Sequence, residues 1–278
     1  MPRNRTTLLE EIFFEGRGIH SGCASSLKIS PNGEGQGITF SFGERRYGIT
    51  EAYADGSRRS TSLFFPGGEC VKTVEHVLSA IAGLGLDDVL ITPEAEEMPI
   101  MDGSPLPFAD AINSCGLREF DSEYAIHSLN APICVDLGES SIVALPSDEL
   151  RITYVIDYPD SPIGTEMKSI AVTRENYMSE IAPARTFCLA GEAMRLREEG
   201  FGLGGSEDNV LIIGDDCPHG SYRVSRECAA HKVADLLGDM ALAGFVPRAH
   251  YICVRGGHAL HMKLADRVKR NVLKNSGR

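Results

Sequence analysis

Residues 73–81 read Thr-Val-Glu-His-Val-Leu-Ser-Ala-Ile, and residues 231–240 read His-Lys-Val-Ala-Asp-Leu-Leu-Gly-Asp-Met. In both segments apolar residues recur at i, i+3, i+4 and i+7, the period of an amphipathic helix. They are Val74, Val77, Leu78 and Ile81 in the first segment and Val233, Leu236, Leu237 and Met240 in the second. The opposite faces carry histidines and aspartates among small residues. The sequence therefore predicts two helices that are each buried on two faces, with potential ligands where they meet.

The second segment contains a candidate pair of metal ligands. His231 and Asp235 are four residues apart, so they project from one helix face and can reach one cation. A third ligand from elsewhere would leave one position for water, as in catalytic zinc sites, where the ion lowers the pKa of that water to about 7. Glu75, beside His76, is placed to accept a proton from it. The spacing alone leaves a second interpretation open, in which the histidines are hydrogen-bonded core residues.

Composition narrows the class of protein. The chain has 278 residues, of which 42% are apolar and 24% charged, an ordinary globular mixture long enough for one large or two medium domains. Its net charge of −12 argues against nucleic acid as a partner. The eight cysteines show no Cys-x-x-Cys spacing, which favours free thiols and a cytoplasmic location. No 18-residue apolar run is present, and the basic residues of segment 266–278 are expected to be a solvated helix face, with peripheral membrane contact as the alternative.

The two halves of the chain repeat one pattern. Each predicted helix runs into a glycine-containing stop, followed by a strand-like run (residues 88–92 and 250–254), a glycine turn and another helix. Short strand-like runs precede each helix, at residues 26–30, 37–42, 134–137, 141–144 and 152–157. Strands first and helices later in each half favour an α+β fold over a doubly wound parallel sheet. We expect two similar domains, 1–122 and 127–278, separated by the polar stretch near residues 120–130.

Several motifs between residues 6 and 268 resemble those of the UDP-3-O-acyl-N-acetylglucosamine deacetylase family, and they occur in the same order as in that family. The most specific are Thr-Val-Glu-His at residues 73–76 and His-Lys-x-x-Asp-x-x-Gly-Asp at residues 231–239. The others are Gly-Arg-Gly-Ile-His-Ser-Gly (16–22), Met-Pro-Ile-Met-Asp-Gly-Ser (98–104), Ala-Arg-Thr-Phe (184–187), Gly-Leu-Gly-Gly-Ser (202–206) and Gly-His-Ala-Leu (257–260).

The resemblance implies both a fold and a reaction. It implies two similar α+β domains, each a mainly antiparallel sheet with helices on one face, so that the helices are sandwiched between two outer sheets. It also implies a zinc-dependent amidase of lipid A synthesis that removes the acetyl group from the 2-amino position of an acylated UDP-sugar. The expected cofactor is Zn2+, with Fe2+ as an alternative, and the expected state is a monomer.

The resemblance also implies roles for individual residues. The zinc ligands would be His76, His231 and Asp235. Glu75 would be the general base, and His258 the general acid, with Asp239 beside it favouring the imidazolium form. The remaining implied roles are stabilisation of the oxyanion by Thr186 and substrate contacts by Lys232 and Phe187.

The chain departs from the family at three places. Ala230 stands where the family usually has Arg, His261 stands where it usually has Asn, and the segment between Gly214 and Arg226 is short. These departures leave two alternatives open. One is a zinc amidohydrolase of a different nucleotide sugar, and the other is a non-catalytic homologue that binds a UDP-sugar.

The remaining motifs are expected to be structural. His20 is expected to be a turn histidine bonded to backbone, with approach to the substrate as the alternative, and Asp102 and Gly103 are expected to form a turn. The other histidines have no spacing that indicates a partner: His127, His219, His250 and His261.

Overall fold

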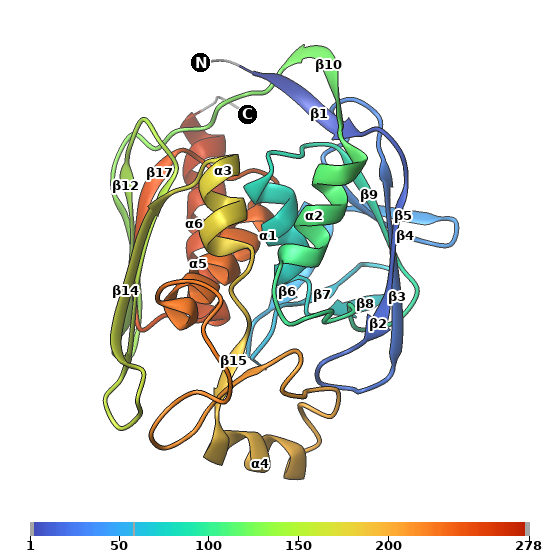
Figure 1. Ribbon diagram of the computed structural model, residues 1–278. Helices are drawn as coiled ribbons and strands as arrows, with labels where there is room; N and C mark the ends of the chain where they lie inside the picture. The colour runs from blue at the N-terminus through green and yellow to red at the C-terminus, as the bar shows by residue number, and fades with distance from the viewer. Residues whose placement is uncertain (1–2, 58, 276–278) are drawn as a thin grey trace.

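Two five-stranded sheets form the outer layers of the protein, and helices fill the space between them (Figure 1). The computed structural model describes residues 3–57 and 59–275. Among these residues, no helix combines the length and the apolar character needed to cross a membrane. The predicted α+β class with helices between outer sheets is confirmed.

The sheet of the N-terminal half has the strand order β2-β3-β9-β4-β5. All neighbouring strands are antiparallel except β4 and β9, which are parallel. Its helices are α1 (Glu75–Gly83) and α2 (Leu106–Cys115). The strands are β2 (Ile12–Arg17), β3 (Ala24–Pro31), β4 (Ile38–Phe42), β5 (Arg45–Gly48) and β9 (Val89–Pro93).

The sheet of the C-terminal half has the order β11-β12-β17-β13-β14, with β13 and β17 as its single parallel pair. Its helices are α5 (Glu227–Met240) and α6 (His258–Asn275). The strands are β11 (Ile133–Leu137), β12 (Ser140–Pro146), β13 (Arg151–Tyr158), β14 (Gly164–Ala171) and β17 (Ala249–Val254). In each half the order is first, second, fifth, third and fourth strand, so the predicted repeat is confirmed in the topology.

Smaller elements complete the two halves. β1 (Asn4–Leu8) pairs with β10 (Leu117–Glu123), and β15 (Phe187–Leu189) runs parallel to β16 (Leu211–Ile213). Strands β6 (Tyr53–Asp55), β7 (Ser62–Phe64) and β8 (Cys70–Lys72) form a three-stranded sheet. The remaining helical segments are α3 (Arg174–Asn176), a π-helical turn (Tyr177–Ile181), α4 (Ala190–Glu198), and 3-10 turns at Ile49–Glu51 and Ala241–Ala243. In Figure 1, α4 and β15 lie together at one end of the helical layer.

Helices α1 and α5 form the centre of the core, where they pack directly on each other. Every residue of α1 except Ala82 is buried, and every residue of α5 except Lys232. A β-carbon at Gly238 would lie 2.1 Å from the carbonyl oxygen of Glu75, so only glycine allows the two helices to approach this closely. The prediction that both helices are buried on two faces is therefore confirmed, and the faces that meet are those that carry the predicted ligands.

Candidate active site

The contact between α1 and α5 brings together two histidines and one aspartate from opposite halves of the chain. The Oδ1 atom of Asp235 lies 3.3 Å from Nε2 of His231 and 3.9 Å from Nε2 of His76. The two imidazole rings are nearly perpendicular, with centroids 5.0 Å apart. All three side chains are buried. The structure thus brings together the three residues predicted to bind metal.

The arrangement of polar atoms fits a metal ion at this group. Asp235 Oδ1 and His76 Nδ1 are buried without a hydrogen-bond partner. Nδ1 of His231 is within 3.1 Å of the carbonyl oxygen of Ala184 and donates its proton there, which leaves the lone pair of Nε2 directed at the group. Ligand atoms about 2.0–2.2 Å from a tetrahedral zinc ion lie roughly 3.3–3.6 Å apart. The observed separations are close to these values.

The charges of these side chains suit a cation as well. Burial lowers the pKa of His76 to about 3 and also lowers the pKa of His231, so both rings are neutral and can act as ligands. Burial alone would raise the pKa of Asp235. The positive charges of Lys232 and His258 help to outweigh that effect and hold the pKa well below its usual range, so the carboxylate is ionised. Two neutral imidazoles and a buried anion form a complete set of deprotonated ligands.

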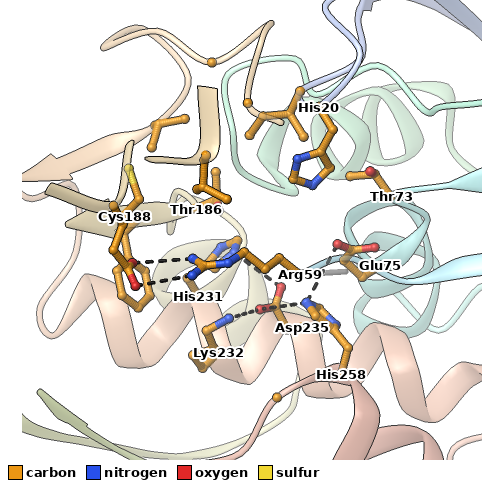
Figure 2. Close-up of a pocket in the computed structure, with 18 of the residues that line it drawn as sticks. His20, Arg59, Thr73, Glu75, Thr186, Cys188, His231, Lys232, Asp235 and His258 are labelled. Atoms are coloured by element: carbon orange, nitrogen blue, oxygen red, sulfur yellow. Dashed lines mark hydrogen bonds and ion pairs between the residues drawn. The ribbon is translucent and has the colours of Figure 1, made fainter. Parts of the chain in front are cut away.

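Glu75 and His258 face each other beside this group. Glu75 Oε1 lies 3.9 Å from His258 Nε2, and Glu75 Oε2 accepts a hydrogen bond of 3.0 Å from the main-chain N–H of Thr61. Nε2 of His258 also lies 3.9 Å from Oδ2 of Asp235. On the other side of the ring, Nδ1 of His258 is 2.8 Å from Oδ2 of Asp239. Figure 2 shows the carboxylate of Glu75 and the ring of His258 on the same side of the pocket.

Glu75 and His258 have pKa values shifted in directions that favour acid–base chemistry. Burial raises the pKa of Glu75 to about 7, although the attraction of His258 partly offsets it. Burial lowers the pKa of His258, but the carboxylates of Asp239, Asp235 and Glu75 outweigh burial and raise it to about 9. At a pH between these two pKa values, Glu75 is a carboxylate and His258 is an imidazolium. The pair can therefore accept a proton at one group and donate one at the other.

The other predicted site residues lie around the same group. Lys232 Nζ is 2.8 Å from Asp235 Oδ2 and 5.7 Å from the ring centroid of Phe187. Burial lowers the pKa of Lys232, but Asp235 outweighs it and raises the pKa, so the amine is charged. Thr186 lies in the pocket wall, fixed by a 2.7 Å hydrogen bond from its main-chain N–H to the carbonyl of Gly103.

These residues line a cavity of about 550 Å³ between the two halves. This volume is within the range typical of small-molecule sites. Ionic side chains stand at the cavity floor and rim, including Arg59, which pairs with Glu192 at 3.3 Å, and Arg255. The apolar part of the wall extends along α4 and the segments around it: Ile19, Ile100, Leu189, Leu196, Val210 and Ile212. The cavity can thus receive a molecule with a charged part and an apolar part.

Some residues at or near the cavity have surroundings that the sequence did not predict. The sequence spacing indicated no partner for His261, but its Nδ1 lies 2.8 Å from Asp239 Oδ2, the atom that also faces His258. The spacing of His258 and His261, three residues apart on one helix, is the signal that indicates a shared face. His20 lies in a turn as predicted, yet its ring lines the cavity with Nδ1 buried and unpaired, instead of bonding to backbone.

Asp102 has a larger role than the turn predicted for it. Its Oδ1 accepts hydrogen bonds from the N–H and the hydroxyl of Ser104, at 3.0 and 2.8 Å, as expected for a turn. Its Oδ2 also forms a 2.6 Å ion pair with Arg223, which joins the two halves of the chain.

The fold and the site together define a class of protein. Two topologically equivalent α+β units share a group of two histidines and one aspartate that could hold a metal ion, with a carboxylate–imidazole pair at its side. The model of the family UDP-3-O-acyl N-acetylglycosamine deacetylase matches residues 5–270, and the chain belongs to this family.

Curated relatives support this membership over nearly the whole chain. The UDP-3-O-acyl-N-acetylglucosamine deacetylase of Chlamydia trachomatis serovar L2 is 35% identical over 276 residues, covering 96% of this chain and 95% of the relative. The protein of the same name from Chlamydia caviae is also 35% identical, with 96% and 98% covered. That from Leptospira biflexa is 32% identical over 277 residues, with 98% and 92% covered.

Proposed function

We propose that this protein is a zinc-dependent deacetylase of UDP-3-O-(3-hydroxyacyl)-N-acetylglucosamine. It hydrolyses the 2-acetamido group and releases acetate and the free amine, an early step of lipid A synthesis. One observation carries the proposal beyond family membership. The buried, unpaired carboxylate oxygen of Asp235 lies between two neutral imidazoles, next to a base and an acid in opposite protonation states.

His76, His231 and Asp235 would hold the metal ion. We take it to be zinc, while iron(II) suits the same set of ligands. When bound there, the ion supplies positive charge that activates water and polarises the amide carbonyl. A cation would give Asp235 Oδ1 the partner it lacks, because Lys232 binds only Oδ2 and a buried polar atom without a partner costs free energy.

Glu75 and His258 divide the proton transfers. Hydrolysis adds water to the amide carbon, breaks the carbon–nitrogen bond and leaves acetate and an amine. Glu75 accepts the proton of the attacking water, since burial keeps its basicity near neutrality. His258 gives a proton to the departing nitrogen, which is otherwise a poor leaving group, and Asp239 stabilises the imidazolium until then. Both side chains line the cavity, with Glu75 Oε1 and His258 Nε2 3.9 Å apart, so both can face a group that is bound there.

Three further residues bind and orient the substrate in this proposal. Thr186, in the cavity wall, stabilises negative charge that develops on the former carbonyl oxygen. Lys232 supplies positive charge for an anionic substrate in a protein of net charge −12. Phe187, near Lys232, provides an apolar surface for the sugar or acyl group.

The sequence departures do not favour the alternative functions. Ala230 is fully buried in α5, and His261 lies beneath the cavity wall. A non-catalytic role in binding a UDP-sugar would not require Glu75, His258 and the metal ligands together. The proposal extends to the organisation of the protein, namely two domains at 1–122 and 127–278, a monomer, and a cytoplasmic location.

The test is direct measurement of acetyl loss. Purified protein is incubated with UDP-3-O-(3-hydroxyacyl)-N-acetylglucosamine, before and after chelation and after return of zinc, and products are followed by mass spectrometry. We expect loss of one acetyl group that chelation abolishes and zinc restores. UDP-N-acetylglucosamine, which lacks the acyl chain, serves as the control for substrate class and should react far more slowly. A folded, zinc-loaded sample that leaves the acylated substrate intact would contradict the proposal.

A further inference from the structure

A second polar cluster lies behind the catalytic pair, and Asp239 is at its centre. The Nδ1 atoms of His258 and His261 each lie 2.8 Å from the same oxygen, Oδ2 of Asp239. The hydroxyl of Thr61 donates to the other oxygen, Oδ1. Asp239 and His261 are both fully buried. One carboxylate on α5 is thus held by two side chains of α6 and one from the N-terminal half.

The protons in this cluster can be assigned from the charges. Burial alone would raise the pKa of Asp239, but His258 and the hydrogen bonds outweigh it and lower the pKa, so the carboxylate only accepts. Both Nδ1 atoms therefore carry protons. Burial lowers the pKa of His261, so that ring is neutral and its Nε2 has no proton. This Nε2 accepts from the hydroxyl of Tyr154 at 2.9 Å, because burial raises the pKa of that hydroxyl and keeps it protonated.

His258 needs external support because of its position. It is the first residue of α6, directly after Gly256 and Gly257, so no preceding helical turn restrains its side chain. The N-terminus of an 18-residue helix also disfavours a positive imidazolium. The orientation and the charge of His258 both depend on where the carboxylate of Asp239 stands. Apart from His258 itself, two donors hold this carboxylate, the Thr61 hydroxyl at Oδ1 and Nδ1–H of His261 at Oδ2, so His261 is the only other donor at the oxygen that faces His258 among the hydrogen bonds of the described residues.

We infer that His261 is a positioning residue for the proposed deacetylation: its Nδ1–H, with the hydroxyl of Thr61, fixes the Asp239 carboxylate against Nδ1 of His258 and so directs Nε2 of His258 into the cavity. The inference rests on the proposed function, because His258 is the proton donor in that reaction. His261 itself does not line the cavity. Its loss should therefore change the rate of the chemical step and leave substrate binding unaffected.

Three substitutions separate the two ring nitrogens of His261. Asparagine places an amide nitrogen near the position of Nδ1, glutamine places one near Nε2, and leucine has no donor. We expect His261→Asn to keep kcat within about threefold of the wild type. His261→Gln and His261→Leu should lower kcat by about ten- to a hundredfold with KM unchanged, the scale on which small displacements of catalytic groups act. His250→Asn, an outward-facing histidine on β17, is the matched control and should have no effect.

A second readout does not depend on activity. In zinc-loaded protein labelled with 15N-histidine, the buried Nδ1–H protons of His258 and His261 should appear as separate, slowly exchanging downfield signals. His261→Asn should remove only the signal of residue 261. His261→Gln should also shift or broaden the signal of His258. If leucine at this position prevents folding, the glutamine variant decides, because it retains a partner for the Tyr154 hydroxyl.

The outcomes distinguish this inference from the proposed function. Wild-type kcat and an unshifted His258 signal in His261→Gln would overturn the positioning role. Equal losses in the asparagine and glutamine variants would overturn it too, since Nδ1 donation would then not be the feature that matters. If the wild-type protein does not deacetylate the acylated UDP-sugar, the proposed function fails, and the NMR signals alone decide whether His261 positions His258.

Discussion

Replacement of Gly238 by alanine tests the central claim that the contact between α1 and α5 builds the site. Gly238 lies in the interior of α5, and a β-carbon there would be 2.1 Å from the carbonyl oxygen of Glu75 and 3.1 Å from the N–H nitrogen of Ser79. These atoms belong to the α1 backbone, so no side chain can rotate away. Since β-carbon contacts under 3.0 Å essentially do not occur, the helices must separate by about 0.9 Å.

Two opposing effects set the change in stability. Alanine in a helix interior is favoured over glycine by about 1 kcal/mol. Overpacking a tight core costs about 1–3 kcal/mol, and contact with backbone places this case at the upper end. We therefore expect Gly238→Ala to lower the free energy of unfolding by about 1–2 kcal/mol. The same separation moves His76 relative to His231, and a misplacement of about 1 Å typically reduces catalysis by about a hundredfold.

The measurements are urea unfolding, zinc affinity and deacetylase rate. Gly191→Ala is the matched control, because Gly191 is exposed near the start of α4 and a β-carbon there meets no atom within 4 Å. That variant should be as stable as the wild type or slightly more stable, with normal activity. If Gly238→Ala unfolds at the wild-type urea concentration, binds zinc normally and keeps its rate, the close helix contact does not define the site.

Three further predictions follow from named groups. Arg185→Ala should lower the free energy of unfolding in urea by about 3–5 kcal/mol, because it leaves the buried carboxylate of Glu227 without its guanidinium partner. The control Arg270→Ala removes one partner of an exposed ion pair and should change the stability little, so equal effects of the two substitutions would refute this prediction. Glu75→Gln should lower kcat by about 10²–10⁴-fold while elemental analysis still finds one metal ion; a rate near wild type would reject Glu75 as the base. The pH profile of kcat/KM should be bell-shaped, falling below a pH of about 7 as Glu75 is protonated and above a pH of about 9 as His258 loses its proton. If the decrease on the alkaline side persists in His258→Gln, that decrease belongs to another group.

A bound divalent cation moves the acid side of that profile in a known direction. The proposed ligand His76 is adjacent to Glu75 in the chain, so positive charge at the proposed metal site favours the ionised carboxylate. The acid limb of the metal-loaded enzyme should therefore lie at or below the value of about 7. Replacement of zinc by iron(II) preserves this sign, because both ions carry the same charge.

The sequence could predict that His76, His231 and Asp235 come together because the information for this is local. In α1 and α5 the apolar stripe and the ligands have the period of one helix, and the small residues on the ligand face indicate a close contact there. The strands β9 and β17 each follow their helix after a short glycine-containing stop, and this common order indicated the repeat. A helix that is buried on both faces must direct apolar or small residues toward its neighbours at every turn, and the sequence therefore shows this pattern directly.

Features that depend on long-range packing were not predictable in this way. Thr61 contacts Asp239 across 178 residues of sequence, and no spacing indicates that contact. The sequence pattern also did not indicate that α5 begins at Glu227, four residues before the predicted start. The residue before it, Arg226, has a φ of 57° and no capping side-chain hydrogen bond, so the usual signal of a helix start is missing.

Two groups of three side chains in this site could each bring ligand atoms within 4.8 Å of one another, namely His76, His231 and Asp235, and Asp239, His258 and His261. They contain the same residue types and are equally buried. What separates them is the placement of protons. In the second group Asp239 already receives N–H and O–H donors at both oxygens, so a cation would have to displace protons that neutralise the buried charge. In the first group Oδ1 of Asp235 receives no donor. The hydrogen bonds therefore favour the first group as the proposed metal site and the second as the proposed support for proton transfer, a distinction that residue types and spacing alone do not contain.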